Sequence, residues 1–390
     1  MTNYWENDPM NTLKINSLLT IFIFLAFIYS PTFLFIFSIG TPTGEQEKRN
    51  LSSMPSLPYN KESFSSYPKQ FEEWLNDHIP YKHFFVNTYK SEMIYWFSPN
   101  KMGKVIIGKN GWLFYDPDGK DGDPIKNYIG NKLSSTEKNK ISQNAQIVGE
   151  YAMKNGITLL LVVAPNKETV LNENLPESLK ILGPGASNKT TDFLNAITHP
   201  SIVKIDLREK FKNVKNKSQT FFKTDTHWNN YGAWIATETI LSELKKIDPL
   251  IPIPQVEKIE KTNAPLGDLI NMLGSTNNFS DENFIVTDNF PHLESKCQNN
   301  TSELQSEQIN CFSQNALSQK KVLILRDSFC HLLCPQIARF FSNSRWIVRV
   351  DLHLTDIDNY KPDIIILEIV ERFANHFDIY GFSDDQSMSF

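Results

Sequence analysis

The chain has 390 residues, of which 40% are hydrophobic and 12% aromatic, and its formal net charge at pH 7 is -5. This length allows for two domains, and the apolar content is enough for a sizeable core. Lysines and acidic residues are interspersed without a long basic block, so we expect no nucleic-acid partner.

An apolar segment opens the chain. Residues 15–39 are rich in Phe, Ile and Leu and carry no charge, which predicts a transmembrane helix and signal anchor within residues 1–40, since about 20 apolar residues cross a bilayer. A cleaved signal peptide is the alternative, although its apolar region is typically only about 7–15 residues long. Lys14 before the segment and Lys48 and Arg49 after it weakly favour a cytoplasmic body by the positive-inside rule.

A linker and a helical region are predicted next. Residues 41–66 are rich in Ser, Pro, Asn and Lys and are typical of an extended linker, which leaves residues 67–390 as the main domain. Aromatic side chains recur at roughly helical spacing over residues 71–96, with a break at Pro80. We interpret this region as amphipathic and helical, with aromatic side chains that belong to a core rather than to a ligand platform.

Two short apolar strands follow. Residues 104–108 and 111–115 flank Lys109-Asn110-Gly111, a pattern that predicts a β-hairpin. The acidic loop 116–123 lacks the spacing and the closing glutamate of an EF-hand, so we interpret it as a solvated turn and expect no metal site.

The remainder of the chain alternates between strand and helix patterns. Unbroken apolar runs are typical of strands buried on both faces, so we predict an α/β fold with a parallel sheet flanked by helices. The predicted strands are residues 157–164, 202–207, 321–326, 346–350 and 363–369, and the predicted helices are residues 136–155, 232–246 and 329–342. Residues 271–319 are polar, and we expect them to form an irregular inserted loop.

Ser328 lies at a predicted strand-to-helix corner, in Asp327-Ser328-Phe329. Such a corner exposes the hydroxyl and turns it toward the partly positive end of a helix. A serine becomes a nucleophile when a base takes its proton, and the usual base is an imidazole oriented by a carboxylate. Asp225 and His227, in Asp225-Thr226-His227-Trp228, offer both groups from one loop, so we predict a Ser-His-Asp catalytic site.

Each of these motifs also has an ordinary structural interpretation. Asp-Ser before a helix is a common N-cap signal, and Asp-Thr-His-Trp can be a polar turn ahead of the next helix. Their presence together on an α/β scaffold favours catalysis, because functional residues gather at the carboxyl ends of parallel strands. Asn166, Lys167 and Arg326 also follow or end predicted strands, and we predict that they contribute to substrate or oxyanion binding, with a turn residue as the alternative for Asn166.

The four cysteines leave more than one pairing open. Cys297 and Cys311 flank a polar stretch and could close a small loop as a disulfide, whereas Cys330 and Cys334 lie one helical turn apart. Four cysteines allow three pairings, and free buried thiols are an equal alternative.

The order of these motifs resembles the alginate O-acetyltransferase group, the AlgJ/AlgX-type proteins with an SGNH-hydrolase-like domain. The resemblance extends from the linker to the end of the chain. It is carried by Glu47-Lys-Arg-Asn-Leu51, Phe71-Glu-Glu-Trp-Leu-Asn-Asp-His78, Gly108-Lys-Asn-Gly-Trp-Leu-Phe-Tyr115, Ala164-Pro-Asn-Lys167, Thr224-Asp-Thr-His-Trp-Asn229, Gly267-Asp-Leu269, Arg326-Asp-Ser-Phe329 and Glu371-Arg372.

The resemblance implies a function and a location. Ser328 would be the nucleophile, His227 the general base and acid, and Asp225 the orienting carboxylate, with no cofactor. Members of the group are extracytoplasmic and move acetyl groups onto exported polysaccharide. They receive these acetyl groups through a multispanning membrane acyltransferase. This favours a single-pass protein of the inner membrane with a periplasmic catalytic domain. Arg326 departs from the glycine that many SGNH proteins carry at its position, and we expect no carbohydrate-binding module after the domain.

The sequence leaves two alternatives to the acetyltransferase open. A carbohydrate or acyl esterase would use the same triad, with water in place of the acceptor hydroxyl. A non-catalytic scaffold of a polysaccharide export complex would not need the triad.

Overall fold

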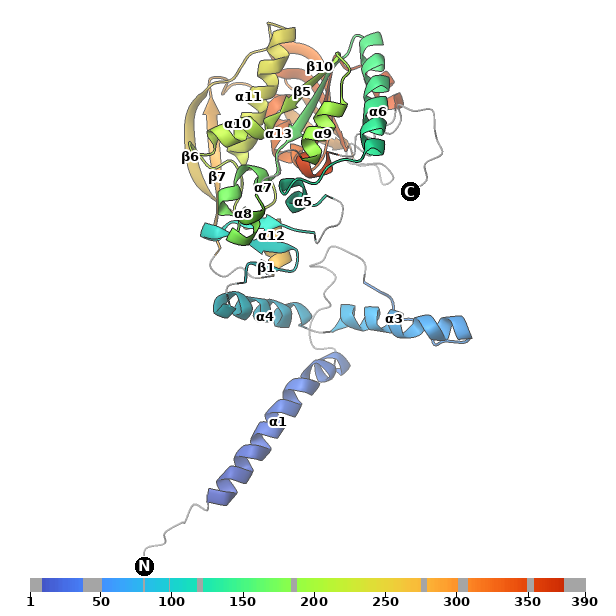
Figure 1. The fold of residues 1–390 in the computed structure, drawn as a ribbon, viewed down its shortest axis with the longest axis vertical. Coiled ribbons are helices and arrows are strands. Elements are labelled where there is room, and N and C mark those ends of the chain that lie inside the picture. Colours follow the sequence, from blue (N-terminus) through green and yellow to red (C-terminus); the bar gives the residue numbers. More distant parts are fainter. Residues whose placement is uncertain are drawn as a thin grey trace, which may run out of the picture. The chain divides into compact units, whose positions relative to one another are not determined.

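The computed structural model describes residues 9–37, 51–79, 81–97, 99–117, 122–183, 188–274, 279–300, 308–348 and 354–374. The chain divides into two compact units, Met1–Trp96 and Phe97–Phe390 (Figure 1).

The first unit is helical. It contains α1 (Pro9–Ile36), α3 (Lys61–His78) and most of α4 (Lys82–Phe97). No helix among the described residues is both long and apolar enough to cross a membrane, so the transmembrane helix predicted within residues 1–40 is not confirmed.

Helix α3 begins within the segment that we expected to be linker. Its first turn is closed by a capping box, in which Asn60 Oδ1 accepts the N–H of Ser63 at 2.7 Å and Ser63 Oγ accepts the N–H of Asn60 at 3.0 Å. A capping box supplies partners for helix amides that have none within the helix, and Ser/Asn-rich composition alone therefore did not indicate a linker here.

The aromatic residues of α4 are not core residues, contrary to our expectation. Phe84 is 63% exposed and Tyr89 is 64% exposed. Helical spacing showed that these residues share a helix, but the side chains stay on its open surface. Pro80, the expected break, lies outside the described residues, between the end of α3 at His78 and the start of α4 at Lys82.

The second unit opens with the predicted hairpin. Strands β2 (Val105–Ile107) and β3 (Leu113–Tyr115) pair antiparallel, and β1 (Lys101–Met102) adds to β2. The turn between them, Lys109–Gly111, places Asn110 at φ 56° and Gly111 at φ 77°. Asn and Gly tolerate this left-handed conformation, which explains why the hairpin could be predicted from the sequence.

A seven-stranded sheet forms the centre of the second unit, in the order β5-β4-β12-β10-β11-β9-β8. The first five strands run parallel, and β9 and β8 add antiparallel to the edge, so the sheet is mixed rather than purely parallel. The strand bounds are β5 Ile202–Asp206, β4 Thr158–Ala164, β12 Ile364–Val370, β10 Ser318–Arg326, β11 Phe341–Val348, β9 Gln308–Phe312 and β8 Lys296–Asn300.

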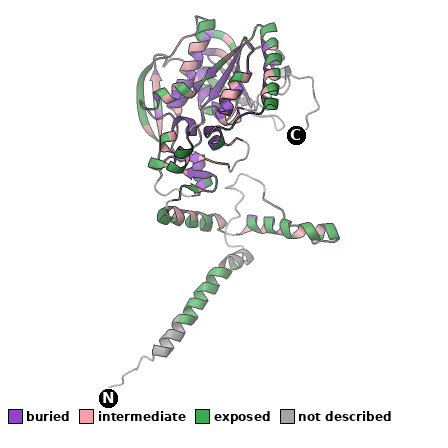
Figure 2. Ribbon diagram, viewed as in Figure 1, coloured by how far each residue is buried: buried purple, intermediate pink, exposed green. Residues whose placement is uncertain are grey.

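Helices cover both faces of this sheet, which confirms the predicted α/β fold. Successive residues of the central strands point to opposite faces, so Leu160 and Val162 of β4 join one hydrophobic cluster while Leu159 and Leu161 join the other. The first cluster includes residues of α10 (Leu207–Val214), α11 (Asn230–Ile247) and α13 (Cys330–Ala338), and the second includes residues of α6 (Ser135–Lys154), α9 (Lys189–Ala196) and α14 (Leu354–Tyr360). The buried residues concentrate between these layers (Figure 2).

The polar stretch 271–319 is not an irregular loop. It contains β7 (Asp281–Asp288), which pairs with β6 (Val256–Ala264) as a separate ribbon, and it supplies β8 and β9 to the main sheet. Strand β8 is the edge of the main sheet and β9 lies next to it, and β6 and β7 form a two-stranded ribbon. These strands expose many of their side chains, so they do not need the apolar runs by which central strands are recognised. Residues 275–278 and 301–307 of this stretch lie outside the described residues.

The helix after Ser328 is shorter than predicted. Helix α13 ends at Ala338, and Phe341 already begins β11. Short helices also follow β4 and the β6 ribbon strand: α7 (Lys167–Val170), α8 (Glu177–Leu182) and α12 (Asp268–Leu273).

Candidate active site

Ser328 lies in the turn between β10 and α13. The preceding residue, Asp327, fixes this corner. Its Oδ1 accepts the N–H of Phe329 at 2.9 Å, and its Oδ2 accepts the N–H of Val370, at the end of the neighbouring strand β12, at 2.7 Å. Asp327 therefore has a structural role, and it holds the serine at the carboxyl edge of the sheet.

The loop before α11 carries the other two predicted residues. An antiparallel bridge between Phe221 and Trp228 closes the loop. The indole of Trp228 is fully buried, and its Nε1 donates to the carbonyl oxygen of Phe329 at 2.9 Å. This bond ties the loop to the corner that carries Ser328, although the two segments are about a hundred residues apart in the chain.

The structure brings Ser328, His227 and Asp225 into one chain of hydrogen bonds. His227 Nε2 lies 2.9 Å from Ser328 Oγ, and His227 Nδ1 lies 2.6 Å from Asp225 Oδ1. Burial raises the pKa of Asp225, but the hydrogen bonds and charge of His227 outweigh it and hold that pKa at about 2. Asp225 is therefore an anion at neutral pH, which fixes the imidazole with its free nitrogen toward the serine.

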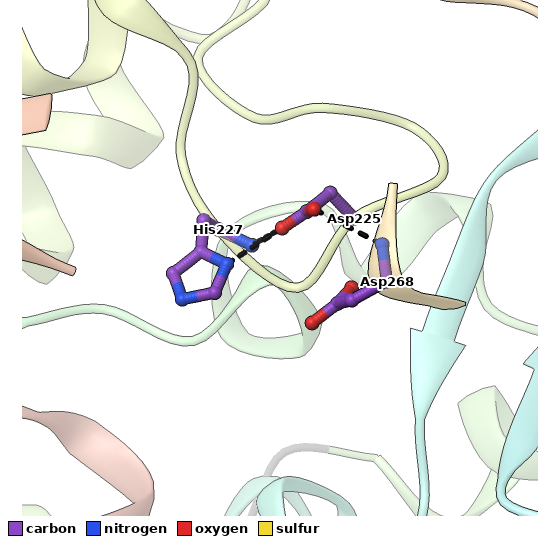
Figure 3. A group of neighbouring side chains, drawn as sticks. All are labelled: Asp225, His227 and Asp268. Atoms are coloured by element: carbon purple, nitrogen blue, oxygen red, sulfur yellow. Dashed lines mark hydrogen bonds and ion pairs between the residues drawn. The ribbon is translucent and has the colours of Figure 1, made fainter. Parts of the chain in front are cut away.

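Asp268 is a fourth member of the cluster that the sequence analysis did not assign. Figure 3 shows Asp225, His227 and Asp268 as neighbours. The backbone N–H of Asp268 donates to Asp225 Oδ2 at 3.1 Å, so both oxygens of Asp225 are engaged. The motif Gly267-Asp268-Leu269 was the available signal, but nothing in the sequence shows that Asp268 meets Asp225, 43 residues earlier.

A cavity of about 350 Å³ opens beside the serine. Its lining includes the three triad residues, aromatic and aliphatic side chains, and two basic residues. These residues are Phe222, Asp225, His227, Trp228, Arg326, Ser328, Phe329, His331 and Leu332. The cavity can therefore admit a small ester group to Ser328, and Arg326, one of the predicted binding residues, lines it.

Lys167 does not line this cavity. Its side chain is buried, and its Nζ donates to the carbonyl oxygens of Phe222 (3.0 Å), Lys223 (3.2 Å) and Asp225 (2.6 Å). Burial lowers the pKa of Lys167 to about 8. The ammonium group therefore stabilises the loop that carries Asp225 and His227. It does so by binding the loop backbone, and it does not face the cavity.

Asn166 belongs to a second polar region at the same edge of the sheet. Its N–H donates to Glu371 Oε2 at 2.9 Å, and the polar atoms of its buried side chain have no hydrogen-bond partner among the described residues. Glu371 lies 3.7 Å from the guanidinium of Arg208, and burial raises the pKa of this carboxyl group. Asn166 does not line the cavity beside Ser328.

All four cysteines are paired in the structure. Cys330 and Cys334 form a disulfide within α13, directly after Ser328, and Cys297 and Cys311 join the neighbouring strands β8 and β9. The structure therefore selects one of the three pairings that the sequence allowed.

A family model described as an SGNH hydrolase-like domain of the acetyltransferase AlgX matches residues 105–309. This match covers more than half of the chain. The chain belongs to this AlgX-type family of SGNH hydrolase-like acetyltransferase domains. The matched residues contain Asp225, His227 and Asp268, and Ser328 follows them.

The chain is also similar to curated proteins that are named as acetylases. A protein named probable alginate O-acetylase AlgJ from Pseudomonas syringae pv. tomato is 25% identical over 257 residues, which is 64% of this chain and 60% of that protein. The AlgJ relative from Azotobacter vinelandii is 26% identical over 184 residues, 46% of this chain and 43% of the relative. The chain thus spans about half the length of these relatives.

A solved structure supports the fold. The structure of Bacillus cereus PatB1 with a sulfonyl adduct matches 72% of this chain and 99% of its own, with a TM-score of 0.54 and 15% identity. At that identity the likeness concerns the architecture alone, and it agrees with the SGNH-like α/β fold.

Proposed function

We propose that this protein is an O-acetyltransferase that moves acetyl groups onto hydroxyls of a polysaccharide through an acetyl-serine intermediate. The observation that carries the proposal is the chain of hydrogen bonds from Ser328 Oγ through His227 to Asp225. The acetyltransferase family and the names of the AlgJ relatives support the type of reaction and the class of acceptor.

The first half of the proposed reaction forms the intermediate. His227 Nε2 takes the proton of Ser328 Oγ, and the oxygen attacks the carbonyl carbon of an acetyl ester or thioester. Asp225 stabilises the imidazolium that results, since its carboxylate contacts Nδ1. We assign stabilisation of the oxyanion to backbone amides at the Ser328 corner. The leaving group departs with the proton from His227, and Ser328 keeps the acetyl group.

The second half transfers the acetyl group. An acceptor hydroxyl enters the cavity beside Ser328 and gives its proton to His227, and its oxygen attacks the acetyl-serine carbonyl. Collapse of the tetrahedral intermediate breaks the bond to Ser328 Oγ, which recovers its proton from His227. Water would follow the same steps and give hydrolysis, so transfer and esterase activity differ only in the nucleophile that reaches the cavity.

We also propose that the catalytic unit works outside the cytoplasm, at the inner membrane, and receives acetyl groups from a multispanning membrane acyltransferase. The two disulfides support this location, because disulfides form and persist mainly in oxidising compartments. Cell fractionation, followed by protease treatment of spheroplasts, tests the location. Protection of the catalytic unit from external protease would contradict it.

The test of the reaction uses the full-length protein and its Ser328→Ala variant. A chromogenic acetyl ester is supplied with and without an oligosaccharide acceptor, and acetylated sugar and free acetate are both measured. We expect acetyl transfer by the wild-type protein and an acetyl group on the Ser328 peptide after rapid quenching. A folded Ser328→Ala protein that acetylates the acceptor at the full rate would remove the proposal, and acetate release unaffected by acceptor would identify an esterase.

A further inference from the structure

Asp268 contacts the triad loop in two ways. Its backbone N–H donates to Asp225 Oδ2 at 3.1 Å, and its carboxylate accepts two hydrogen bonds from Thr226. Oδ1 accepts the N–H of Thr226 at 2.8 Å, and Oδ2 accepts its hydroxyl at 2.7 Å. Thr226 lies between Asp225 and His227 in the chain, so the bonds from Thr226 to Asp268 hold the backbone that connects Asp225 to His227.

The same cluster has the residue types of a cation site. Ligand atoms of Asp225, His227 and Asp268 lie within 4.8 Å of one another. However, these carboxylate oxygens already accept hydrogen bonds from Thr226, from His227 and from the N–H of Asp268. These hydrogen bonds hold the loop that carries Asp225 and His227, and we call the segment Gly267-Asp268 with its bonds to Thr226 and Asp225 the clasp.

Close packing supports this clasp. Gly267 precedes Asp268, and a Cβ atom placed on Gly267 would come within 2.3 Å of Asp225 Cβ and 2.6 Å of Asp225 Cα. The backbone of the Gly267-Asp268 segment therefore lies directly against Asp225. No side chain of Gly267 separates its backbone from Asp225, so a displacement of the Gly267-Asp268 segment would displace Asp225 as well.

The clasp determines the direction of the Asp225 carboxylate. One oxygen faces the N–H of Asp268, which leaves the other oxygen to face His227 Nδ1 at 2.6 Å. The Thr226 hydroxyl also lies 3.3 Å from His227 Nδ1. Catalytic groups need supporting residues of this kind, because a misplacement of about 1 Å can cost about 10²-fold in rate.

We propose that Asp268 is a positioning residue for the triad, which acts through Thr226 and the Asp225 carboxylate to keep His227 directed at Ser328. Asp268 itself does not line the cavity beside the serine. This inference rests on the proposed function, since it assigns a part in the same site.

The test compares Asp268→Ala, Asp268→Asn and Thr226→Val in the full-length protein. The readouts are kcat and KM for an acetyl ester and the rate at which phenylmethylsulfonyl fluoride modifies Ser328. We expect Asp268→Ala to lower both kcat and the sulfonylation rate about 10- to 100-fold with KM nearly unchanged. Asparagine keeps an acceptor for the Thr226 N–H, and the hydroxyl can rotate to accept from its amide, so Asp268→Asn should restore most of the rate.

Asp281 provides a matched control. Its carboxylate holds the same loop by accepting the N–H of Lys223 at 2.8 Å and the N–H and hydroxyl of Thr224 at 2.7 and 2.5 Å, but among the described residues it makes no hydrogen bond to Asp225, Thr226 or His227. Asp281→Ala should therefore lower the melting temperature while the sulfonylation rate of the folded protein stays within about threefold of wild type. Equal losses of sulfonylation rate in Asp281→Ala and Asp268→Ala would overturn the proposal, because the role would then be general support of the loop.

The combined variant and the serine variant complete the test. Because Asp268 acts through Thr226, Asp268→Ala combined with Thr226→Val should be no slower than Asp268→Ala alone, and additive losses would contradict this route. Full turnover by Ser328→Ala would remove the proposed function instead. The sulfonylation rates still decide the role of Asp268 in that case, because they report the reactivity of Ser328 without any acetyl substrate. If Asp268→Ala does not fold, Thr226→Val takes its place: it removes the hydroxyl that donates to Asp268 Oδ2 at 2.7 Å, so it should lower the sulfonylation rate, whereas Asp281→Ala should not.

Discussion

The carboxyl edge of the main sheet holds two polar regions that differ in their surroundings. Around Ser328, a serine, an imidazole and carboxylates are hydrogen-bonded to one another beside a cavity, and the pKa of Asp225 is about 2. Around Glu371, the side chains are buried, burial raises the pKa of the carboxyl group, and the side chain of Asn166 has no partner among the described residues. A place at this edge is therefore not sufficient for a site; a cavity and donors arranged around a reactive group are also needed.

The sharpest test of this comparison removes the imidazole. We expect His227→Ala to lower acetyl-ester turnover at least about 10³-fold with little change in melting temperature, because the base is lost from a partly exposed position. His199→Ala is the matched control. His199 is buried and bonds Ser201 at 2.8 Å, so its loss should lower stability and leave turnover of the folded protein unchanged. Equal turnover of the two variants would contradict the assignment of the base.

Gly267→Ala displaces Asp225 without changing any triad residue. The added methyl group would meet Asp225 atoms at 2.3 to 2.6 Å, so one of the two segments must shift. We expect turnover to fall about 10- to 100-fold and the free energy of unfolding to fall by about 1–3 kcal/mol. Steady-state kinetics and urea unfolding measure the two effects. A variant with wild-type values in both would show that the structure accommodates the methyl group without displacing the Asp225 carboxylate.

Lys167→Met removes the buried ammonium group from the loop. The carbonyl oxygens of Phe222, Lys223 and Asp225 lose a donor, so we expect a loss of about 1–3 kcal/mol in the free energy of unfolding and about 10-fold in turnover. Guanidinium unfolding and ester turnover measure these losses.

The same variant isolates a pH dependence. The folded protein holds Lys167 at a pKa of about 8, below its ordinary value of 10.5, so between these values the unfolded chain binds more protons. The free energy of unfolding of wild type should therefore rise with pH over this interval relative to Lys167→Met, by at most about 1.4 kcal/mol per pH unit. A parallel course of the two proteins from pH 8 to 10 would show that Lys167 does not titrate there.

Glu371→Gln should have the smallest effect on turnover and stability, because Glu371 belongs to the polar region outside the cavity beside Ser328. Glutamine keeps an oxygen for the N–H of Asn166, and Arg208 keeps its pair with Asp206 at 2.7 Å. We expect turnover within about twofold and a free energy of unfolding within about 1 kcal/mol of wild type. A loss of turnover close to that of His227→Ala would place Glu371 in the catalytic machinery and remove the distinction between the two regions.

The central part of the fold could be predicted because its strands are buried on both faces. Strands β4, β10 and β12 were each found from unbroken apolar runs. The edge strand β8, its neighbour β9 and the ribbon β6–β7 were missed, since a strand that exposes much of its surface can be polar. The end of α13 was missed for a related reason: Ser342 and Asn343 are polar, yet they lie in β11, whose pairing with β10 is not visible in the local sequence.

The site could be predicted in part, because Asp225 and His227 are close in sequence and Ser328 lies at a recognisable corner. The clasp by Asp268 and the anchor from Lys167 depend on contacts between residues 42 and 58 positions apart, which spacing does not reveal. Lys167 was expected at the substrate because it follows a strand, but its long side chain reaches the loop backbone instead.

The bond between Cys297 and Cys311 has a practical consequence for handling the protein. It joins β8 to β9, so a cut in the backbone between the two cysteines leaves both fragments covalently attached. Preparations nicked there would migrate as one band on a non-reducing gel and as two after dithiothreitol. Tags or epitopes introduced into that stretch should consequently be tolerated better than at junctions where only hydrogen bonds retain the outer strand.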